Sequence, residues 1–176
     1  MEFEENAQPH RLDLFRMSMR RAASSVSLVT ARGVEDEYCG MAVTSWASVS
    51  MSPPAMLVIV NRSASVHAAI SATGRFCLNQ MGEAHAPMLE RFSRSDMRHL
   101  RFDPQDWEEE PDGLPILKGA LSSLTCTVET TSNYSTHSIF VGRVDRVILL
   151  ELAPGRVAPL IWMDGSRASL TTRPPH

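Results

Sequence analysis

Segments with the character of β-strands follow one another along most of this chain of 176 residues, and only a few short stretches between them have helical periodicity. Most of these segments alternate apolar residues with small or polar ones, which is the period of a strand with one buried face. Residues 55–60 are apolar throughout, as expected of a strand covered on both faces. The pattern does not support a doubly wound parallel sheet. Because closure removes exposed edge strands, we expect a closed or partly closed antiparallel β-barrel.

Turn residues and helix-stop residues divide the chain into its predicted elements. The predicted strands cover residues 26–31, 39–44, 55–60, 76–80, 121–131, 137–150 and 157–163, and the first two form a hairpin with one apolar face. An amphipathic helix is predicted over residues 11–23, with an apolar stripe that we expect to be buried. Ser65 is predicted to cap a second helix that ends at Gly74, and a third short helix is expected around Met88. Residues 93–113 are predicted to form a solvated surface loop.

The composition predicts one soluble domain over residues 11–170, with flexible segments at 1–10 and 171–176. The formal net charge is only −3, which provides no basic surface for nucleic acid. No apolar run approaches the roughly 20 residues of a membrane helix, and residues 1–10 lack the apolar core of a signal peptide. We therefore expect a cytoplasmic protein that binds neither membranes nor nucleic acid. The three cysteines, Cys39, Cys77 and Cys126, are expected to be reduced thiols in the core.

Several well-defined site motifs are absent from the sequence. The nine glycines form neither the G-x-G-x-x-G pattern of dinucleotide-binding folds nor a phosphate-binding loop followed by Lys and Ser or Thr. The six histidines are dispersed, so we expect no metal site. There is also no G-x-S-x-G motif of a serine hydrolase.

Residues 40–54 form the first candidate binding segment, because small and hydroxyl side chains dominate where a strand gives way to a loop. Small side chains allow a flat ligand to approach the backbone, whose N–H and C=O groups can bind a planar heterocycle together with the hydroxyls, and an indole can form an aromatic wall. The alternative is a plain edge strand rich in hydroxyl groups. The candidate residues are Thr44, Ser45, Trp46, Ala47, Ser48 and Ser50.

A second candidate segment follows the apolar strand and leads into a helix. It contains Asn61, Arg62, Ser63 and Ser65. The free N–H groups and the dipole of a helix N-terminus favour an anion, and the Arg62 guanidinium adds further donors. The alternative is an ordinary helix cap with a solvated arginine. Together, the two segments suit a planar ring joined to a phosphate, which is the shape of a flavin nucleotide.

The order of motifs from about Met17 to Leu170 resembles the short-chain flavin reductases, the NAD(P)H:flavin oxidoreductases that serve two-component flavin monooxygenases. The resemblance implies a mainly β fold, the antiparallel FMN-binding split β-barrel with Greek-key connections and a few short helices, usually paired as a homodimer. It also implies hydride transfer from NADH or NADPH to FMN or FAD and a separate monooxygenase as partner. The motifs are residues 26–30, 40–50, 52–54, 61–63, 74–79, 114–120 with Cys126, and 137–144.

The resemblance also implies roles for individual residues. Thr44, Ser45, Trp46, Ala47, Ser48 and Ser50 would line the isoalloxazine ring, and Asn61, Arg62, Ser63 and Ser65 would hold the ribityl phosphate. His137 falls at the catalytic position that faces the nicotinamide, and Gly165, Ser166 and Arg167 occupy the segment that helps to hold the nicotinamide nucleotide. Asn79 and Cys126 also match the pattern, and we interpret both as structural.

Three positions depart from the family pattern, which usually has Thr at Ala42, Asp at Thr136, and Tyr or Phe near Ser166. A carboxylate beside His137 would favour the protonated imidazole, so its absence weakens that tendency. These departures leave open a non-catalytic flavin-binding or sensor protein on the same barrel, or an oxidase that keeps its flavin. The choices between FMN and FAD and between NADH and NADPH also stay open.

Overall fold

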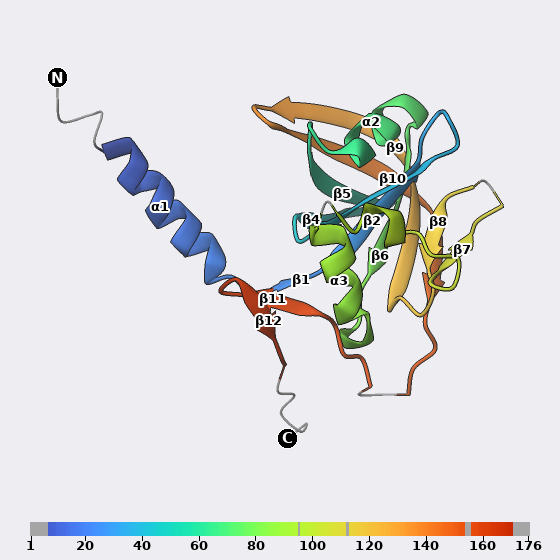
Figure 1. Ribbon diagram of the computed structural model, residues 1–176. Helices are drawn as coiled ribbons and strands as arrows, with labels where there is room; N and C mark the ends of the chain where they lie inside the picture. Colours follow the sequence, from blue (N-terminus) through green and yellow to red (C-terminus); the bar gives the residue numbers. More distant parts are fainter. Residues whose placement is uncertain (1–6, 95, 112, 154–155, 171–176) are drawn as a thin grey trace.

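The computed structural model describes residues 7–94, 96–111, 113–153 and 156–170. A seven-stranded antiparallel sheet forms the body of the molecule, in the strand order β3-β2-β6-β9-β10-β5-β4 (Figure 1). Its strands are β2 (Ser27–Arg32), β3 (Tyr38–Val43), β4 (Trp46–Met51), β5 (Pro54–Asn61), β6 (Arg75–Gln80), β9 (Ser122–Tyr134) and β10 (His137–Leu149). Two small sheets are also present. One contains β1 (Ser24–Ser25), β11 (Ile161–Met163) and β12 (Ser166–Ala168). The other pairs β7 (Trp107–Glu109) with β8 (Pro115–Leu117).

The main core lies inside the curled sheet. Strands from both ends of the strand order contribute to it, and α2 (Ser65–Thr73) packs against it from one side. The sheet therefore closes on itself as a barrel, which confirms the predicted fold class. The main core consists of Val29, Ala31, Cys39, Val43, Met56, Val58, Val60, Val66, Ala69, Ile70, Phe76, Leu78, Cys126 and Phe140.

A second core covers the outer face of β2, where the sequence predicted only one apolar face. Leu28 belongs to this second core, together with Met88 and Phe92 from α3 (Ala86–Ser93) and Trp107 from β7. Its neighbour in the strand, Val29, lies in the main core. The prediction of a hairpin with one apolar face was therefore wrong for β2, because segments far along the chain cover its second face.

The N-terminal helix differs most from its prediction. α1 covers Ala7–Arg20 and extends away from the barrel (Figure 1). It begins inside the segment 1–10 that we expected to be flexible, and residues 171–176, predicted as a tail, lie outside the described residues. The expected stripe of Leu12, Phe15 and Met19 is about half exposed rather than buried. Nothing in this single chain covers that stripe among the described residues.

Strand ends and caps show smaller differences. The hairpin of β9 and β10 is confirmed, and β9 runs three residues beyond its predicted end, to Tyr134. The last predicted strand shortens to β11, and β12 forms a hairpin with it around the predicted turn at Asp164–Gly165. Helix α2 ends at Gly74 as predicted, but its N-cap is Ala64 rather than Ser65.

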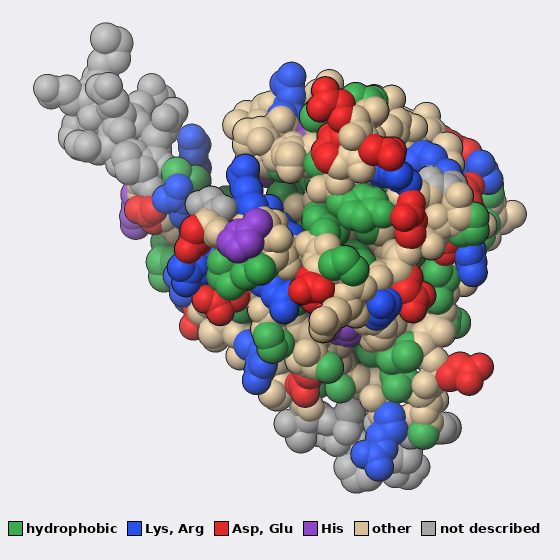
Figure 2. Space-filling model, turned by 45° about the vertical axis from the view of Figure 1, so that its right-hand side comes forward, with side chains coloured by type: hydrophobic (Ala, Val, Ile, Leu, Met, Phe, Trp, Pro, Cys, Tyr) green, Lys and Arg blue, Asp and Glu red, His purple; other side chains and the backbone are tan. Residues whose placement is uncertain are grey.

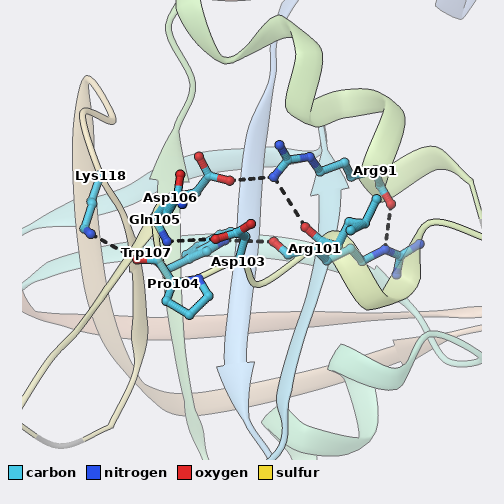
Figure 3. A network of polar contacts seen from close by, with 9 residues as sticks. Arg91, Arg101, Asp103, Pro104, Gln105, Asp106, Trp107 and Lys118 are labelled. Atoms are coloured by element: carbon cyan, nitrogen blue, oxygen red, sulfur yellow. Dashed lines mark hydrogen bonds and ion pairs between the residues drawn. The ribbon is translucent and has the colours of Figure 1, made fainter.

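Residues 96–107 form a connection that is hydrogen-bonded to α3 (Figure 3). The Arg91 guanidinium donates to the Asp106 carboxylate, and the Arg101 guanidinium donates to backbone carbonyls at the end of α3. The buried Trp107 indole donates to the Arg101 carbonyl, and the buried Glu110 carboxylate accepts two hydrogen bonds from Arg146 of β10. The prediction of a solvated loop was therefore wrong for this part of residues 93–113, because these side chains supply the hydrogen bonds that water would otherwise make.

The described part of the chain contains no helix with the length and apolar character needed to cross a bilayer. Figure 2 shows Lys and Arg side chains intermingled with Asp and Glu on one face, between small separate hydrophobic patches. That face therefore carries mixed charge rather than a field of one sign. The three cysteines are free and buried, as predicted.

One buried amide joins the two cores. Asn79 of β6 is fully buried, and its Nδ2 donates to the Leu28 carbonyl and the Thr30 hydroxyl. Its Oδ1 accepts from the Leu117 backbone N–H at 3.0 Å and from the Ser123 hydroxyl at 2.8 Å. Both donors and both acceptor sites of the amide are therefore used. This supports the structural role that we expected for Asn79.

We predict that Asn79→Leu lowers the free energy of unfolding by about 2 to 4 kcal/mol, because the buried Leu117 N–H and other groups lose their partner. Urea denaturation of the two proteins measures the difference. Ser123→Ala is the matched control, since it removes one hydrogen bond without leaving a backbone group unpaired, and it should cost about 1 kcal/mol or less. Equal losses in the two variants would contradict a central role for the amide.

Candidate functional site

Three chain segments meet at one end of the barrel because neighbouring strands run antiparallel. The start of β4 lies beside the end of β5, where the Ile59 N–H donates to the Ser45 carbonyl at 2.9 Å. The start of β10 lies on the other side of β5, where His137 is opposite Asn61. The Arg62 N–H donates to the Thr136 carbonyl at 2.9 Å. The structure therefore brings both predicted binding segments and His137 together.

Strand β4 is an edge strand, so within the described part of the chain one side of the hydroxyl-rich segment has no strand partner. Thr44, Ser45, Ala47 and Ser48 are exposed along it. Ser50 of β4 pairs with Ala55 near the start of β5, and its hydroxyl accepts a hydrogen bond from the Ser52 N–H. The first part of the segment therefore lies at the end where the three segments meet, whereas Ser50 lies away from it.

Trp46 faces the interior. Its indole is partly buried and packs against the main core, and within the described residues its buried Nε1–H has no hydrogen-bond partner. The side chain therefore stabilises the start of β4 from inside, and any contact with a ligand would be made by its exposed part or its backbone.

The segment that leads into α2 is arranged to receive an anion. The Asn61 Oδ1 accepts from both the backbone N–H and the hydroxyl of Ser63, each at 2.9 Å, and this forms a tight turn. Arg62 is exposed, and its guanidinium has no hydrogen bond or ion pair within the described residues. Exposed Ser65 is the first residue of α2, whose N-cap Ala64 makes no side-chain cap. A free guanidinium thus lies beside an uncapped helix N-terminus.

His137 is exposed at the start of β10, and its Nδ1 lies 2.9 Å from the Thr136 hydroxyl. Thr136 stands where the family pattern has Asp, so a neutral hydroxyl takes the place of the carboxylate as partner of the ring. This contact orients the imidazole without adding a negative charge beside it.

Gly165 of the predicted nicotinamide segment lines a groove together with Thr44, whereas Ser166 and Arg167 are not among its lining residues. The groove has a volume of about 510 Å³, which is within the usual range of ligand sites. Gly165 occupies the tight turn between β11 and β12, where its φ is +75°, and exposed Ser166 and Arg167 follow in β12. The lining residues are Met19, Arg20, Ala22, Ser24, Thr44, Trp162, Met163, Asp164 and Gly165.

Sequence reasoning missed Arg20 and Trp162 as groove residues. Arg20 ends α1, its guanidinium donates to the Asp164 carbonyl, and its own carbonyl accepts from the Asp164 N–H. Trp162 also lines a smaller adjoining pocket of about 260 Å³, which Ala42 and Leu89 of α3 share. Neither residue belongs to a recognised motif. They line the groove because α1 packs against the β11–β12 turn, and a local sequence pattern does not show this packing.

His67 was also missed. It lies in the first turn of α2, and its Nε2 is 2.7 Å from the hydroxyl of the buried Ser138. Burial lowers the pKa of His67, and the positive charge of Arg62 lowers it further. The imidazole is therefore held in its neutral form beside the candidate anion site.

We predict that His67 makes the fold less stable in acid. The unfolded chain, with a histidine pKa of about 6.5, takes up this proton before the folded chain does. The free energy of unfolding should therefore fall as the pH drops below about 6.5, until the lowered pKa of the folded state is passed. Urea denaturation of wild type and His67→Gln between about pH 7.5 and pH 5 should show a smaller loss in the variant. Parallel curves would contradict the lowered pKa.

The combined chemistry of the site matches one kind of ligand. Thr44, Ser45 and Ser48 offer neutral hydroxyls along an open strand edge, which suits the donors and acceptors of a planar heterocycle. Arg62 and the N-terminus of α2 offer positive charge to a phosphate. His137 stands beside both segments. These residues fit a planar ring joined to a phosphate.

Comparisons with known proteins show what this chain is similar to. Residues 19–171 match the family model described as the flavin reductase like domain. The chain is 30% identical over 149 residues to the 4-hydroxyphenylacetate 3-monooxygenase reductase component of Pseudomonas aeruginosa, covering 84% of this chain and 87% of that protein. It is 34% identical over 150 residues to FMN reductase (NADH) RutF 2 of Rhizobium rhizogenes, covering 85% of this chain and 84% of that protein.

A solved structure extends the similarity to the fold. The crystal structure of BorF, the flavin reductase component of a bacterial two-component tryptophan halogenase, superposes with a TM-score of 0.80. The two chains are 26% identical, and the superposition covers 92% of this chain and 99% of that one. The similarity therefore extends over most of the fold.

Proposed function

Because this chain belongs to the flavin reductase like domain family, we propose that it is an NAD(P)H:flavin oxidoreductase that supplies reduced flavin to a separate monooxygenase. The observation that supports this most directly is the meeting of three segments at one end of the barrel: the hydroxyl-rich edge, the anion segment and His137. The relatives are named as an FMN reductase (NADH) and as a monooxygenase reductase component, which supports FMN and NADH as the first substrates to test.

Each segment has a role in this proposal. The hydroxyls of Thr44, Ser45 and Ser48, with the backbone around Trp46 and Ala47, bind the flavin ring, whereas Ser50 lies too far along β4 to take the role that the resemblance implied for it. Asn61, Arg62, Ser63 and Ser65 hold its phosphate through the guanidinium, the hydroxyls and the free N–H groups of α2. His137 contacts the nicotinamide as the catalytic residue, and the turn at Gly165 with Ser166 and Arg167 holds the rest of that nucleotide.

The reaction requires positioning more than acid–base catalysis. When the nicotinamide and flavin rings stack, hydride passes directly from one to the other. The residues of the chain orient the two nucleotides, and no side chain has to transfer a proton. A site of neutral hydroxyls with one free arginine binds flavin moderately, which allows the reduced flavin to leave for the monooxygenase.

We predict that purified protein oxidises NADH or NADPH in air only when FMN or FAD is added. The absorbance of the reduced nicotinamide follows the reaction, and riboflavin, which lacks the phosphate, is the matched comparison. Flavin binding without turnover would overturn the reductase function and support the non-catalytic flavin-binding protein. Tightly bound flavin that copurifies and gives little response to NADH would support an oxidase.

We predict that Arg62→Ala weakens FMN binding by about 1 to 3 kcal/mol, because a charge-assisted hydrogen bond to the phosphate is lost. Fluorescence titration measures the dissociation constants of FMN and riboflavin, and riboflavin affinity should change little. Arg98→Ala removes another exposed arginine and is the matched control. An unchanged FMN dissociation constant would remove Arg62 from the phosphate site.

A homodimer is the proposed assembly. Leu57 and Ile59 of β5 lie opposite Val141 and Ile139 of β10, and all four are only partly buried on the outer face of the barrel. The sequence predicted that β5 would be covered on both faces. Its outer face is apolar but only partly buried among the described residues, which is typical of a surface that another chain covers. The apolar stripe of α1 is exposed as well. A second copy of the chain can cover both surfaces at once.

We predict that the protein has about twice the 19.5 kDa chain mass in light scattering and that Phe15→Glu shifts it toward the monomer. A buried charge in the interface destabilises the dimer because it loses its hydration. Asp13→Lys, which changes the charge on the opposite face of α1, should leave the mass unchanged. A wild-type monomer, or an unchanged mass for Phe15→Glu, would contradict this interface.

A cytoplasmic location is part of the same proposal. The three cysteines are free and buried, and free thiols are typical of reducing compartments. Fractionation of cells that produce the protein tests this location.

A further inference from the structure

A short chain of polar contacts links α2 to the tip of the β9–β10 hairpin. The Nε2 of His67 lies 2.7 Å from the hydroxyl of Ser138, and that hydroxyl lies 2.6 Å from the Asn133 Oδ1. Ser138 is fully buried in β10 and lies opposite Asn133 of β9 in the hairpin register. The imidazole also packs against the ring of Phe140, with 5.2 Å between the ring centres. Contacts on two sides therefore fix its orientation.

The direction of the hydrogen bonds follows from the number of protons. Ser138 has one hydroxyl proton, and it donates this proton to the Asn133 Oδ1. The hydroxyl oxygen must therefore accept from His67, which carries a proton on Nε2. Neutral His67 in this tautomer completes the chain without placing a charge in the barrel wall. A side chain without a donor at this position would break the link.

The link joins two parts of the candidate site. His67 lies two residues after Ser65, at the start of the helix that follows the anion segment. Ser138 follows His137 directly, and Asn133 precedes the hairpin turn. A second bond, from the Arg62 N–H to the Thr136 carbonyl, joins the same two segments. Residues 61–67 and 133–138 are therefore tied together at two points.

We propose that His67 is a positioning residue that holds the flavin-phosphate segment and the His137 hairpin tip in a fixed relation to each other. This inference rests on the proposed function, since it assigns those two segments to the flavin phosphate and the nicotinamide. His67 acts through Ser138 and Asn133 rather than through contact with either nucleotide. It therefore influences the binding of both.

Loss of the donor should affect binding more than the chemical step. Without the link, the hairpin tip and the anion segment can move independently, and each nucleotide must bear the cost of ordering its own segment. The KM for NADH and the dissociation constant of FMN should both rise. The kcat at saturation should change little, because bound nucleotides restore the arrangement.

The experiment compares five variants with the wild type. His67→Phe keeps a ring against Phe140 but has no donor, and Ser138→Ala removes the middle of the link without adding volume. The double variant tests whether the two residues act through one chain of contacts. His67→Gln is the conservative variant, because its side-chain amide places an N–H donor at a similar reach. His99→Phe, at an exposed histidine outside the link, is the matched control.

We expect His67→Phe and Ser138→Ala each to raise the KM for NADH by about 5- to 10-fold, the range of one net hydrogen bond, with kcat changed by less than about 2-fold. The double variant should be no worse than either single variant, and His67→Gln should restore the KM to within about 2-fold of the wild type. The FMN dissociation constants should follow the same order. His137→Ala gives the upper limit for the NADH effect.

Two results would overturn the positioning role. One is an unchanged KM and FMN dissociation constant in folded His67→Phe and Ser138→Ala, with only the melting temperature lowered. The other is an additive double variant. If the positioning role fails, turnover by the wild type and by His99→Phe would show that the proposed function still holds. If the wild type binds FMN without turnover, the proposed function fails and the FMN dissociation constants decide the role of His67. If it does not bind FMN, both inferences fail.

Discussion

The buried amide of Asn79 fixes how the wall of the barrel packs against the segments that cover it. It connects β6 with β2, with the segment at Leu117 and with Ser123 of β9, and all of its hydrogen-bonding capacity is used. A buried polar group with every partner in place specifies one arrangement of its neighbours. It lies at the wall where the main core and the second core meet, so it aligns the barrel with the segments that cover its outer face.

The position of the candidate site follows from the pairing of other strands, β4, β5 and β10. Antiparallel pairing brings the start of β4, the end of β5 and the start of β10 to one end of the barrel, although residues 44, 61 and 137 are far apart in the sequence. The strands hold these segments rigidly, and the segments themselves remain open to ligands. Such a site can position two nucleotides with few charged groups, which suits a reaction in which hydride passes directly between them.

Helix α1, which exposes apolar side chains in a single chain, ends beside the groove at this site. The last residue of α1 is bonded to the turn at Asp164–Gly165, and Met19 and Arg20 line the groove with Thr44. The rest of α1 exposes its apolar stripe. A second copy that covers α1 would thereby also hold the base of this helix against the groove. In the homodimer proposed above, α1 would therefore take part both in assembly and in the groove.

Strand periodicity and turn chemistry are local properties of the chain, and they were enough to predict the barrel class, most strands, the helix stop at Gly74 and the segments around Thr44 and Asn61. His137 was predicted only from the resemblance to the flavin reductases. The packing of the folded chain was needed to show that both faces of β2 are buried, that Trp46 faces inward and that Arg20 lines the groove. It also joined His67 to the hairpin tip. Such contacts depend on which distant segments pack together, and a local sequence pattern does not show which segments these will be.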